Sequence, residues 1–213
     1  MSDIIYLSNV RLSFPKLIEP DVKVDPKTNK NIITYSCDLL MPKDHPGFKQ
    51  FMTKYNEMAL EKWGTSVQMV MNMINNDRRF RCYGSGDEKL NQKTFEVYTG
   101  YAGNVYIRAA RFDQPQIFQP DGNKIDNKDT LAYNHLTRDM YAGCNVNAAI
   151  KPWLQDNTHG RGSRCELIAI QFAGDNEPLG SAQLDVSSIF SPSVTPEVGV
   201  NQPTQVVKMP WEQ

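Results

Sequence analysis

Residues 140–153 alternate apolar and polar side chains almost without interruption. One parity is apolar: Ala142, Cys144, Val146, Ala148 and Ile150. The other parity carries polar and aromatic side chains: Tyr141, Asn145, Asn147, Lys151 and Trp153. Because successive side chains of a strand point to opposite faces, this period of two predicts a strand with one buried and one open face. The flexible stretch 158–163 and the run 164–173 then predict a partner strand and a hairpin.

The start of the chain predicts a second hairpin. Its first strand has one mostly apolar parity: Tyr6, Val10, Leu12 and Phe14. Pro15 is expected to end this strand, since proline lacks the N–H that a ladder requires. Residues 25–31 have turn chemistry, and the returning strand carries Ile33, Tyr35, Cys37, Leu39 and Met41 on one parity. A middle strand is predicted at 104–112, with Val105, Ile107 and Ala109 inward and Tyr106 and Arg108 outward.

Helical signals lie between these strands. Asp44 or His45 can cap a helix whose first turn holds Pro46 and whose stop is Gly64. Its apolar stripe is Phe48, Phe51, Met52, Tyr55 and Ala59. A shorter helix with Val67, Val70, Met71 and Ile74 follows, and we interpret the methionine-rich run 69–73 as core filling.

The order of these elements predicts a mainly β fold with inserted helices. Five or more short antiparallel strands favour an OB-fold, a five-stranded Greek-key barrel, over residues 1–180. An α+β sandwich remains the alternative. Residues 181–213 are rich in Pro and Ser and are predicted to form a flexible C-terminal tail.

Several classes of protein are disfavoured. No phosphate-binding loop, nucleophile elbow or HExxH motif occurs, so we expect no enzymatic activity and no cofactor. The three histidines and four cysteines form no close ligand pair, so no metal site is expected. Reduced, buried thiols of a cytosolic protein are the expected state of the cysteines. We find no secretory signal and no run long enough to span a bilayer.

Cationic and aromatic side chains instead predict binding of a single-stranded nucleic acid, because cations contact phosphates and rings stack on bases. The net charge is only −1, so a basic groove would have to come from local clustering. The candidates are Arg78, Arg79, Phe80, Arg81 and Tyr83 before a Gly-rich loop, Tyr106 and Arg108 on the middle strand, Tyr141, Asn145, Asn147, Lys151 and Trp153 on the polar parity, and Arg161 and Arg164 near the last hairpin.

Three segments carry a resemblance to a known family. They are Asn9-Val10-Arg11-Leu12-Ser13-Phe14-Pro15-Lys16-Leu17 with Glu19-Pro20, Tyr141-Ala142-Gly143-Cys144-Asn145-Val146-Asn147-Ala148, and Ile170-Gln171-Phe172-Ala173-Gly174-Asp175-Asn176-Glu177-Pro178-Leu179-Gly180. In this order and spacing the chain resembles the OB-fold single-stranded DNA-binding proteins of tailed bacteriophages.

This resemblance implies a protein that coats single-stranded DNA during phage replication or recombination, in the cytoplasm of the infected host. It implies neither catalysis nor a cofactor. Replication or recombination proteins and further copies of the chain are its expected partners, and a membrane is not. Many proteins with this role end in a strongly acidic tail, whereas this tail has only scattered acids. That difference puts a recruiting function of the tail in doubt.

Two other functions stay open from the residues alone. OB barrels also bind RNA, and no residue here identifies a 2′-hydroxyl reader. An exposed face of Tyr, Trp and Arg equally suits a phage structural or host-interaction protein. Salt separates these cases, because polynucleotide binding weakens steeply with salt and aromatic docking does not.

Overall fold

The computed structural model describes residues 3–26, 28–126 and 129–180. Its longer elements are β1 (Ile5–Val24), β2 (Asn31–Pro42), α1 (Pro46–Trp63), α2 (Val67–Asn76), β4 (Asn104–Arg111), α3 (Thr130–Asp139), β6 (Asn145–Asn157) and β7 (Gly160–Gly174). Two short strands are β3 (Tyr83–Ser85) and β5 (Gln116–Phe118). All of them belong to one compact unit, Met1–Gly180. The predicted tail, Ser181–Gln213, lies outside the described residues.

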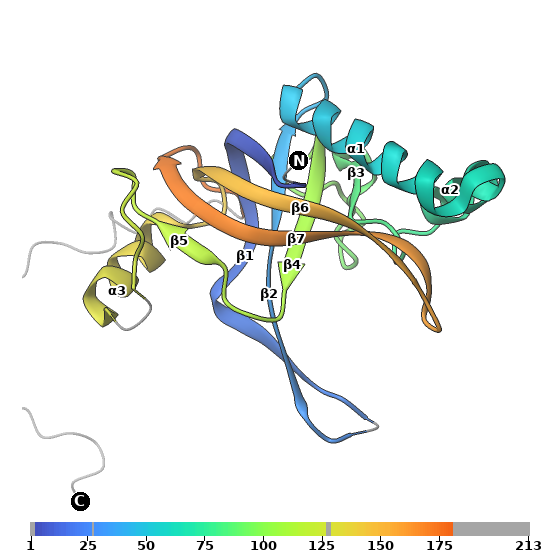
Figure 1. Ribbon diagram of the computed structural model, residues 1–213. Coiled ribbons are helices and arrows are strands. Elements are labelled where there is room, and N and C mark those ends of the chain that lie inside the picture. Colours follow the sequence, from blue (N-terminus) through green and yellow to red (C-terminus); the bar gives the residue numbers. More distant parts are fainter. Residues whose placement is uncertain (1–2, 27, 127–128, 181–213) are drawn as a thin grey trace, which may run out of the picture. The chain divides into compact units, whose positions relative to one another are not determined.

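The strands form one sheet in the order β3-β4-β2-β1-β6-β7-β5. The β6–β7 hairpin curves across β1, β2 and β4, and residues of β4 contact β7 (Figure 1). The five long strands thus curl into the Greek-key barrel expected of an OB-fold, with helices inserted between them. The predicted fold class is confirmed, but the sheet has seven strands, because β3 extends it beside β4 and β5 pairs in parallel with β7.

The strand β1 is longer and less regular than its sequence predicts. Its pairing shifts register at three places, between Leu7 and Val10 along β6 and between Ser13 and Lys16 and again between Lys16 and Asp21 along β2. Asn9 and Phe14 have positive φ angles at the first two of these bulges. The first bulge moves Tyr6 to the exposed face, and Phe14 is exposed at the second. The prediction that Pro15 ends the strand is wrong, because a proline within a bulge need not donate to the ladder.

Beyond the third register shift, β1 and β2 leave the barrel as a two-stranded projection, which we call the arm (Figure 1). The arm comprises residues 21–24 and 31–34, whose four pairs run from Asp21 opposite Thr34 to Val24 opposite Asn31. Outside the arm, β1 and β2 each pair with a further strand. The strand β6 pairs with β1 only as far as Arg11, and β4 pairs with β2 only from Tyr35 onward. Within the described residues, both edges of the arm are therefore open.

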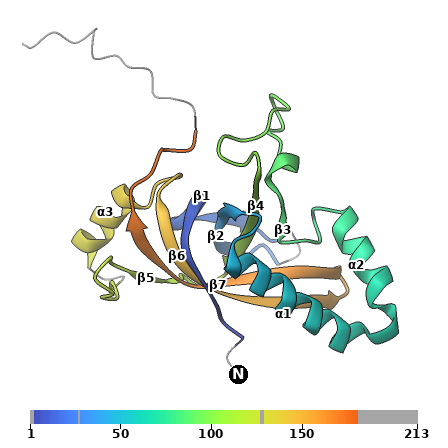
Figure 2. The ribbon, with the colours of Figure 1, turned by 90° about the horizontal axis from the view of Figure 1, so that it is seen from above.

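The helix α1 begins and ends where the sequence predicts. The His45 side chain accepts a hydrogen bond from the N–H of Gly47, and Gly64 ends the helix with a φ of 48°. Viewed from above, α1 and α2 lie toward one end of the barrel and α3 toward the other (Figure 2). The core-filling interpretation of the methionine-rich run is wrong for Met69 and Met73. These side chains are 60% and 57% exposed on the outer face of α2.

Candidate nucleic-acid interface

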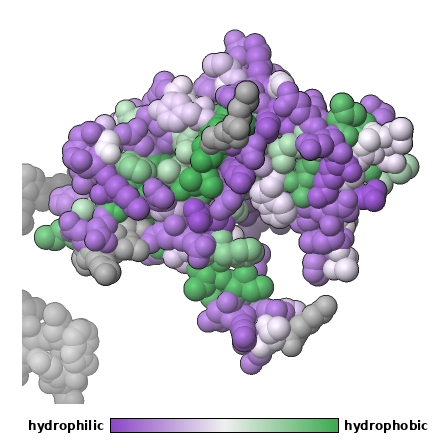
Figure 3. Space-filling view, in the orientation of Figure 1, coloured by the Kyte–Doolittle hydropathy of each residue, from purple (hydrophilic) through white to green (hydrophobic). Residues whose placement is uncertain are grey.

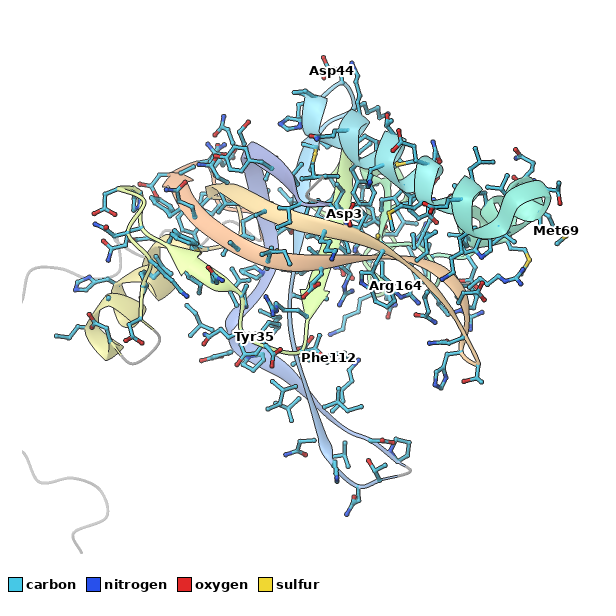
Figure 4. The ribbon with its side chains drawn as sticks, viewed as in Figure 1. Asp3, Tyr35, Asp44, Met69, Phe112 and Arg164 are labelled. Carbon is cyan, nitrogen blue, oxygen red and sulfur yellow. The ribbon has the colours of Figure 1, made fainter. Side chains whose placement is uncertain are left out.

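A cleft of about 470 Å³ lies beside β4 and β7, next to the segment that follows α2. Six arginines line it: Arg78, Arg79, Arg81, Arg108, Arg111 and Arg164. Two aromatic rings also line it, Phe112 at 72% exposure and Trp153 at 43%. Phe112 and Arg164 lie on the side of the barrel from which the arm projects (Figure 4). Cations and open rings therefore share one concave surface.

The fold holds the arginine segment firmly against β7. After α2, the chain turns with a hydrogen bond from the N–H of Phe80 to the carbonyl of Asp77, 3.0 Å long. The carbonyl of Phe80 in turn accepts from the N–H of Ser163 at 2.7 Å. A Cβ at Gly162 would lie 2.7 Å from that carbonyl oxygen, so glycine permits the close approach. The same contact brings the arginine segment beside Arg164.

Three of the six arginines are already paired with carboxylates. The closest N–O distances are 2.6 Å from Arg79 to Asp77, 2.6 Å from Arg81 to Glu88, and 3.7 Å from Arg111 to Glu166. Hydrogen bonds from Arg79 hold the pKa of Asp77 below its usual range, so this carboxylate stays charged at neutral pH. Such pairs lower the positive potential of the cleft.

The other three arginines, Arg78, Arg108 and Arg164, have no ion pair within the part of the chain that is described. Arg164 instead donates to the Oε1 atom of Gln155 at 3.0 Å and to the backbone carbonyl of Ser163 at 3.0 Å. Neutral acceptors leave its charge uncompensated while fixing its position. These three side chains are therefore the principal source of positive potential in the cleft.

Two predicted tyrosines are not on an open face. The alternation places Tyr106 outward, but it is buried under the loop of residues 86–103, with the Tyr101 ring 5.8 Å and the Lys89 Nζ atom 4.5 Å from its ring. Tyr83 is buried against α1, 5.5 Å from the ring of Tyr55. The outward position predicted for Tyr106 is wrong, because strand alternation does not reveal what covers a strand, and Tyr83, a candidate in the arginine segment, is not open to a ligand either.

Three candidates on β6 and the turn before it make structural hydrogen bonds outside the cleft. The Tyr141 hydroxyl accepts from the N–H of Asn176 at 3.1 Å, and the Asn145 Oδ1 atom accepts from its Nδ2 at 3.0 Å. The Asn147 Oδ1 atom accepts from the N–H of Asn9 at 2.9 Å. These side chains are half-buried and fasten the segment after β7 and the first bulge of β1.

The remaining candidates lie around the cleft rather than in its lining. Lys151 is exposed on the same face of β6 as Trp153. Arg161 pairs with Asp156 at 3.3 Å near the turn of the β6–β7 hairpin. Phe80 is half-buried beneath Arg79, whose guanidinium carbon lies 5.6 Å from the ring centroid. The structure thus brings together six of the fourteen predicted residues: Arg78, Arg79, Arg81, Arg108, Trp153 and Arg164.

Sequence reasoning missed Arg111 and Phe112. Arg111 has the inward parity of β4, which argued against exposure, yet at the open end of the barrel its side chain reaches Glu166 of β7. Phe112 has the outward parity of the predicted strand, like Tyr106 and Arg108, but it was not included among the candidates; β4 itself ends at Arg111. The pair of an arginine and a phenylalanine at the end of a strand could have indicated these two residues as candidates for nucleic-acid binding.

The described residues of the cleft include no reactive thiol and no metal site. Cys82 and Cys165 form part of its wall but are buried as free thiols. Burial raises the pKa of Cys82 to about 12, so its thiol is protonated and unreactive at neutral pH. Among the described residues, no group of three His, Cys, Asp or Glu side chains is arranged to hold a metal ion.

Comparisons with known proteins identify a family and a relative from a phage. A family model described as the single-stranded DNA-binding protein of Enterobacter phage Enc34 matches residues 3–196. A phage relative, putative protein p50 of Acyrthosiphon pisum secondary endosymbiont phage 1, is 30% identical over 176 residues, which is 81% of this chain and 84% of that protein.

Two solved structures share the fold. The first is the bacteriophage Enc34 single-stranded DNA-binding protein in complex with single-stranded DNA, with a TM-score of 0.62 and 23% identity over 84% of this chain and 90% of that one. The second is gp2.5, a single-stranded DNA-binding protein encoded by bacteriophage T7. Its TM-score is 0.51 at 10% identity, covering 91% of this chain and 98% of that one.

Proposed function

The chain belongs to the Enc34 family of phage single-stranded DNA-binding proteins, and we propose that it binds single-stranded DNA in the arginine-lined cleft. The observation that supports this location is that six arginines and two exposed aromatic rings line the same concave site. Arginine side chains bind backbone phosphates, and aromatic rings stack on unpaired bases.

The cleft supports binding with little dependence on base sequence. Guanidinium groups contact phosphates, which carry no sequence information, and rings stack on any base. We assign phosphate contacts first to Arg78, Arg108 and Arg164, because no carboxylate competes for them. Trp153 and Phe112 are the proposed stacking rings. Tyr83 and Tyr106 are excluded from this set because they are buried.

The proposed role is to coat single strands during phage DNA replication or recombination in the host cytoplasm, without catalysis. Family membership supports that role, and the cleft contains the groups required for binding. The unit of residues 1–180 is proposed to be sufficient for contact with DNA. The tail, Ser181–Gln213, is proposed to be dispensable for it, on the basis of its Pro- and Ser-rich composition.

One titration tests this function. Fluorescently labelled oligo-dT, oligo-rU and duplex DNA of equal length are titrated with the full chain at two salt concentrations. We expect oligo-dT to bind most tightly and to lose affinity as salt rises, because phosphate contacts release counterions. Equal or tighter binding of oligo-rU would move the assignment to RNA. Salt-independent binding, or none, would contradict a phosphate-binding cleft.

A further inference from the structure

The arm has two faces of different character. Cross-strand partners share a face, so Thr34 lies on the same side as Asp21, Lys23 and Ile32. Because Thr34 lines the cleft, this is the cleft side of the arm. The opposite, outer side carries Val22, Val24 and Ile33 with Asn31, and it contains no charged residue.

The outer side of the arm is an apolar surface without a partner in its own fold. Val22, Val24 and Ile33 are 56%, 57% and 42% exposed, although β-branched side chains at these positions would normally be covered. An apolar patch is visible on the arm in the space-filling view (Figure 3). At roughly 3.3 Å per residue, the four residue pairs of the arm span about 10 Å from Asp21 to Val24.

A second apolar surface lies on α2. Met69 and Met73 are four residues apart, so they share one face of the helix, and both are more than half exposed. No charged residue occurs between positions 64 and 76. Methionine side chains adapt to varied apolar partners. Met69 lies at the helical end of the molecule, away from the arm (Figure 4), so one chain cannot close this contact on itself.

We propose that the outer side of the arm of one copy packs on the Met69–Met73 face of α2 of the next copy along a DNA strand. This inference rests on the proposed function, since the DNA brings the copies together. Neither surface offers a cation to a phosphate, so the occupant of each is protein rather than nucleic acid. The contact joins two different surfaces, and repetition of such a contact produces an open row of copies rather than a closed dimer.

The size of the contact explains why DNA is required. The five apolar side chains expose together on the order of 500 Å², well below the ~1,200 Å² that a stable interface buries. In solution the copies should therefore stay apart. On a shared strand the effective concentration of neighbours rises to the millimolar range or above, where a small apolar contact suffices. The predicted consequence is cooperative binding on long strands without self-association in solution.

The test compares a short and a long DNA. Oligo-dT of about 12 nucleotides holds one copy, and poly-dT holds many. Val24→Glu or Met73→Glu should leave affinity for the short strand unchanged, because neither side chain lies in the cleft. Each should reduce cooperativity on poly-dT about tenfold, because a charge is buried against an apolar surface. Leu131→Glu on α3 is the matched control: it changes a side chain that is 74% exposed on an unrelated helix, and it should change neither measurement.

Opposite charges introduced on the two surfaces test whether these surfaces contact each other. A chain carrying both Val24→Glu and Met73→Lys places opposite charges across every contact in the row, so it should regain most of the lost cooperativity. The chain with Val24→Glu and Met73→Glu should not. Recovery by the first double variant alone establishes contact between the arm and α2, since the two sites are not neighbours within one chain.

The outcomes separate this inference from the function on which it rests. If the unmodified chain fails to bind short oligo-dT, the proposed function fails and the inference fails with it. If it binds short and long strands with equal affinity per site, the inference alone is overturned. Loss of short-strand affinity in Val24→Glu would make the arm a DNA contact instead. Failure of the opposite-charge variant to recover would show that the two surfaces are not partners.

Discussion

Substitution of single arginines measures which cations of the cleft meet phosphate. When a phosphate binds to an unpaired arginine, the DNA releases the counterion that had neutralised that phosphate. When a phosphate binds to an arginine that is paired with a carboxylate, it replaces the carboxylate, which must then bind a cation from solution. The net release of ions is therefore smaller for a paired arginine. With three unpaired arginines at ~0.7 per phosphate, log affinity against log salt should have a slope of about −2; with all six it would approach −4. The internal ion pairs therefore predict the shallower value.

Individual variants sharpen this prediction. Arg108→Gln and Arg164→Gln should each make the slope shallower by about 0.7, because each removes one uncompensated phosphate contact. Arg79→Gln should change it little, because Asp77 already neutralises that side chain. The assay is fluorescence titration of short oligo-dT between about 50 and 300 mM salt, a range over which the Debye length shortens and the screening of charges increases. Equal slopes for all three variants and the unmodified chain would refute the division into paired and unpaired arginines.

Three further predictions follow from the described contacts. Trp153→Ala should weaken binding of oligo-dT by ~1–3 kcal/mol with an unchanged melting temperature, as measured by titration and thermal denaturation, because the exposed ring serves stacking. Lys89→Ala should lower stability by ~3–5 kcal/mol in urea denaturation, because it leaves the buried carboxylate of Asp38 without its 2.7 Å partner. The thiols of Cys82 and Cys144, whose pKa values burial raises to about 12, should resist a thiol reagent at pH 8 and react only after unfolding.

Periodicity and capping made much of the fold predictable from the sequence. The run that ends at Trp153 predicted a strand from residue 140, whereas β6 begins only at Asn145 after a turn. Within β6 the apolar parity is buried as expected, and the other parity is partly open. The boundaries of α1 followed from His45 and Gly64, whose capping geometry is local. Such features depend on residues near in sequence, so the sequence alone determines them.

Features that depend on distant contacts were not predictable in this way. Nothing near Tyr106 indicates that a loop folds over it. The bulge at Asn9 reverses the parity of β1, and no rule of alternation signals a register shift. The sequence predicted no helix between residues 113 and 139, although the cap of α3, Asp129, accepts a hydrogen bond from the N–H of Ala132. Arg111 was overlooked because its parity pointed inward, at a place where the barrel is open.

Local charge separation explains how a chain of net charge −1 can present a DNA-binding surface. Six arginines line the cleft, yet three of them pair with neighbouring carboxylates, namely Asp77, Glu88 and Glu166. Electrostatic attraction should therefore supply less of the affinity than in a groove of uncompensated cations. Stacking on Trp153 and Phe112 must then supply more, and base stacking is far less sensitive to salt than phosphate contact. Removal of a ring should consequently lower the affinity by about the same factor at every salt concentration and leave the slope of log affinity against log salt unchanged.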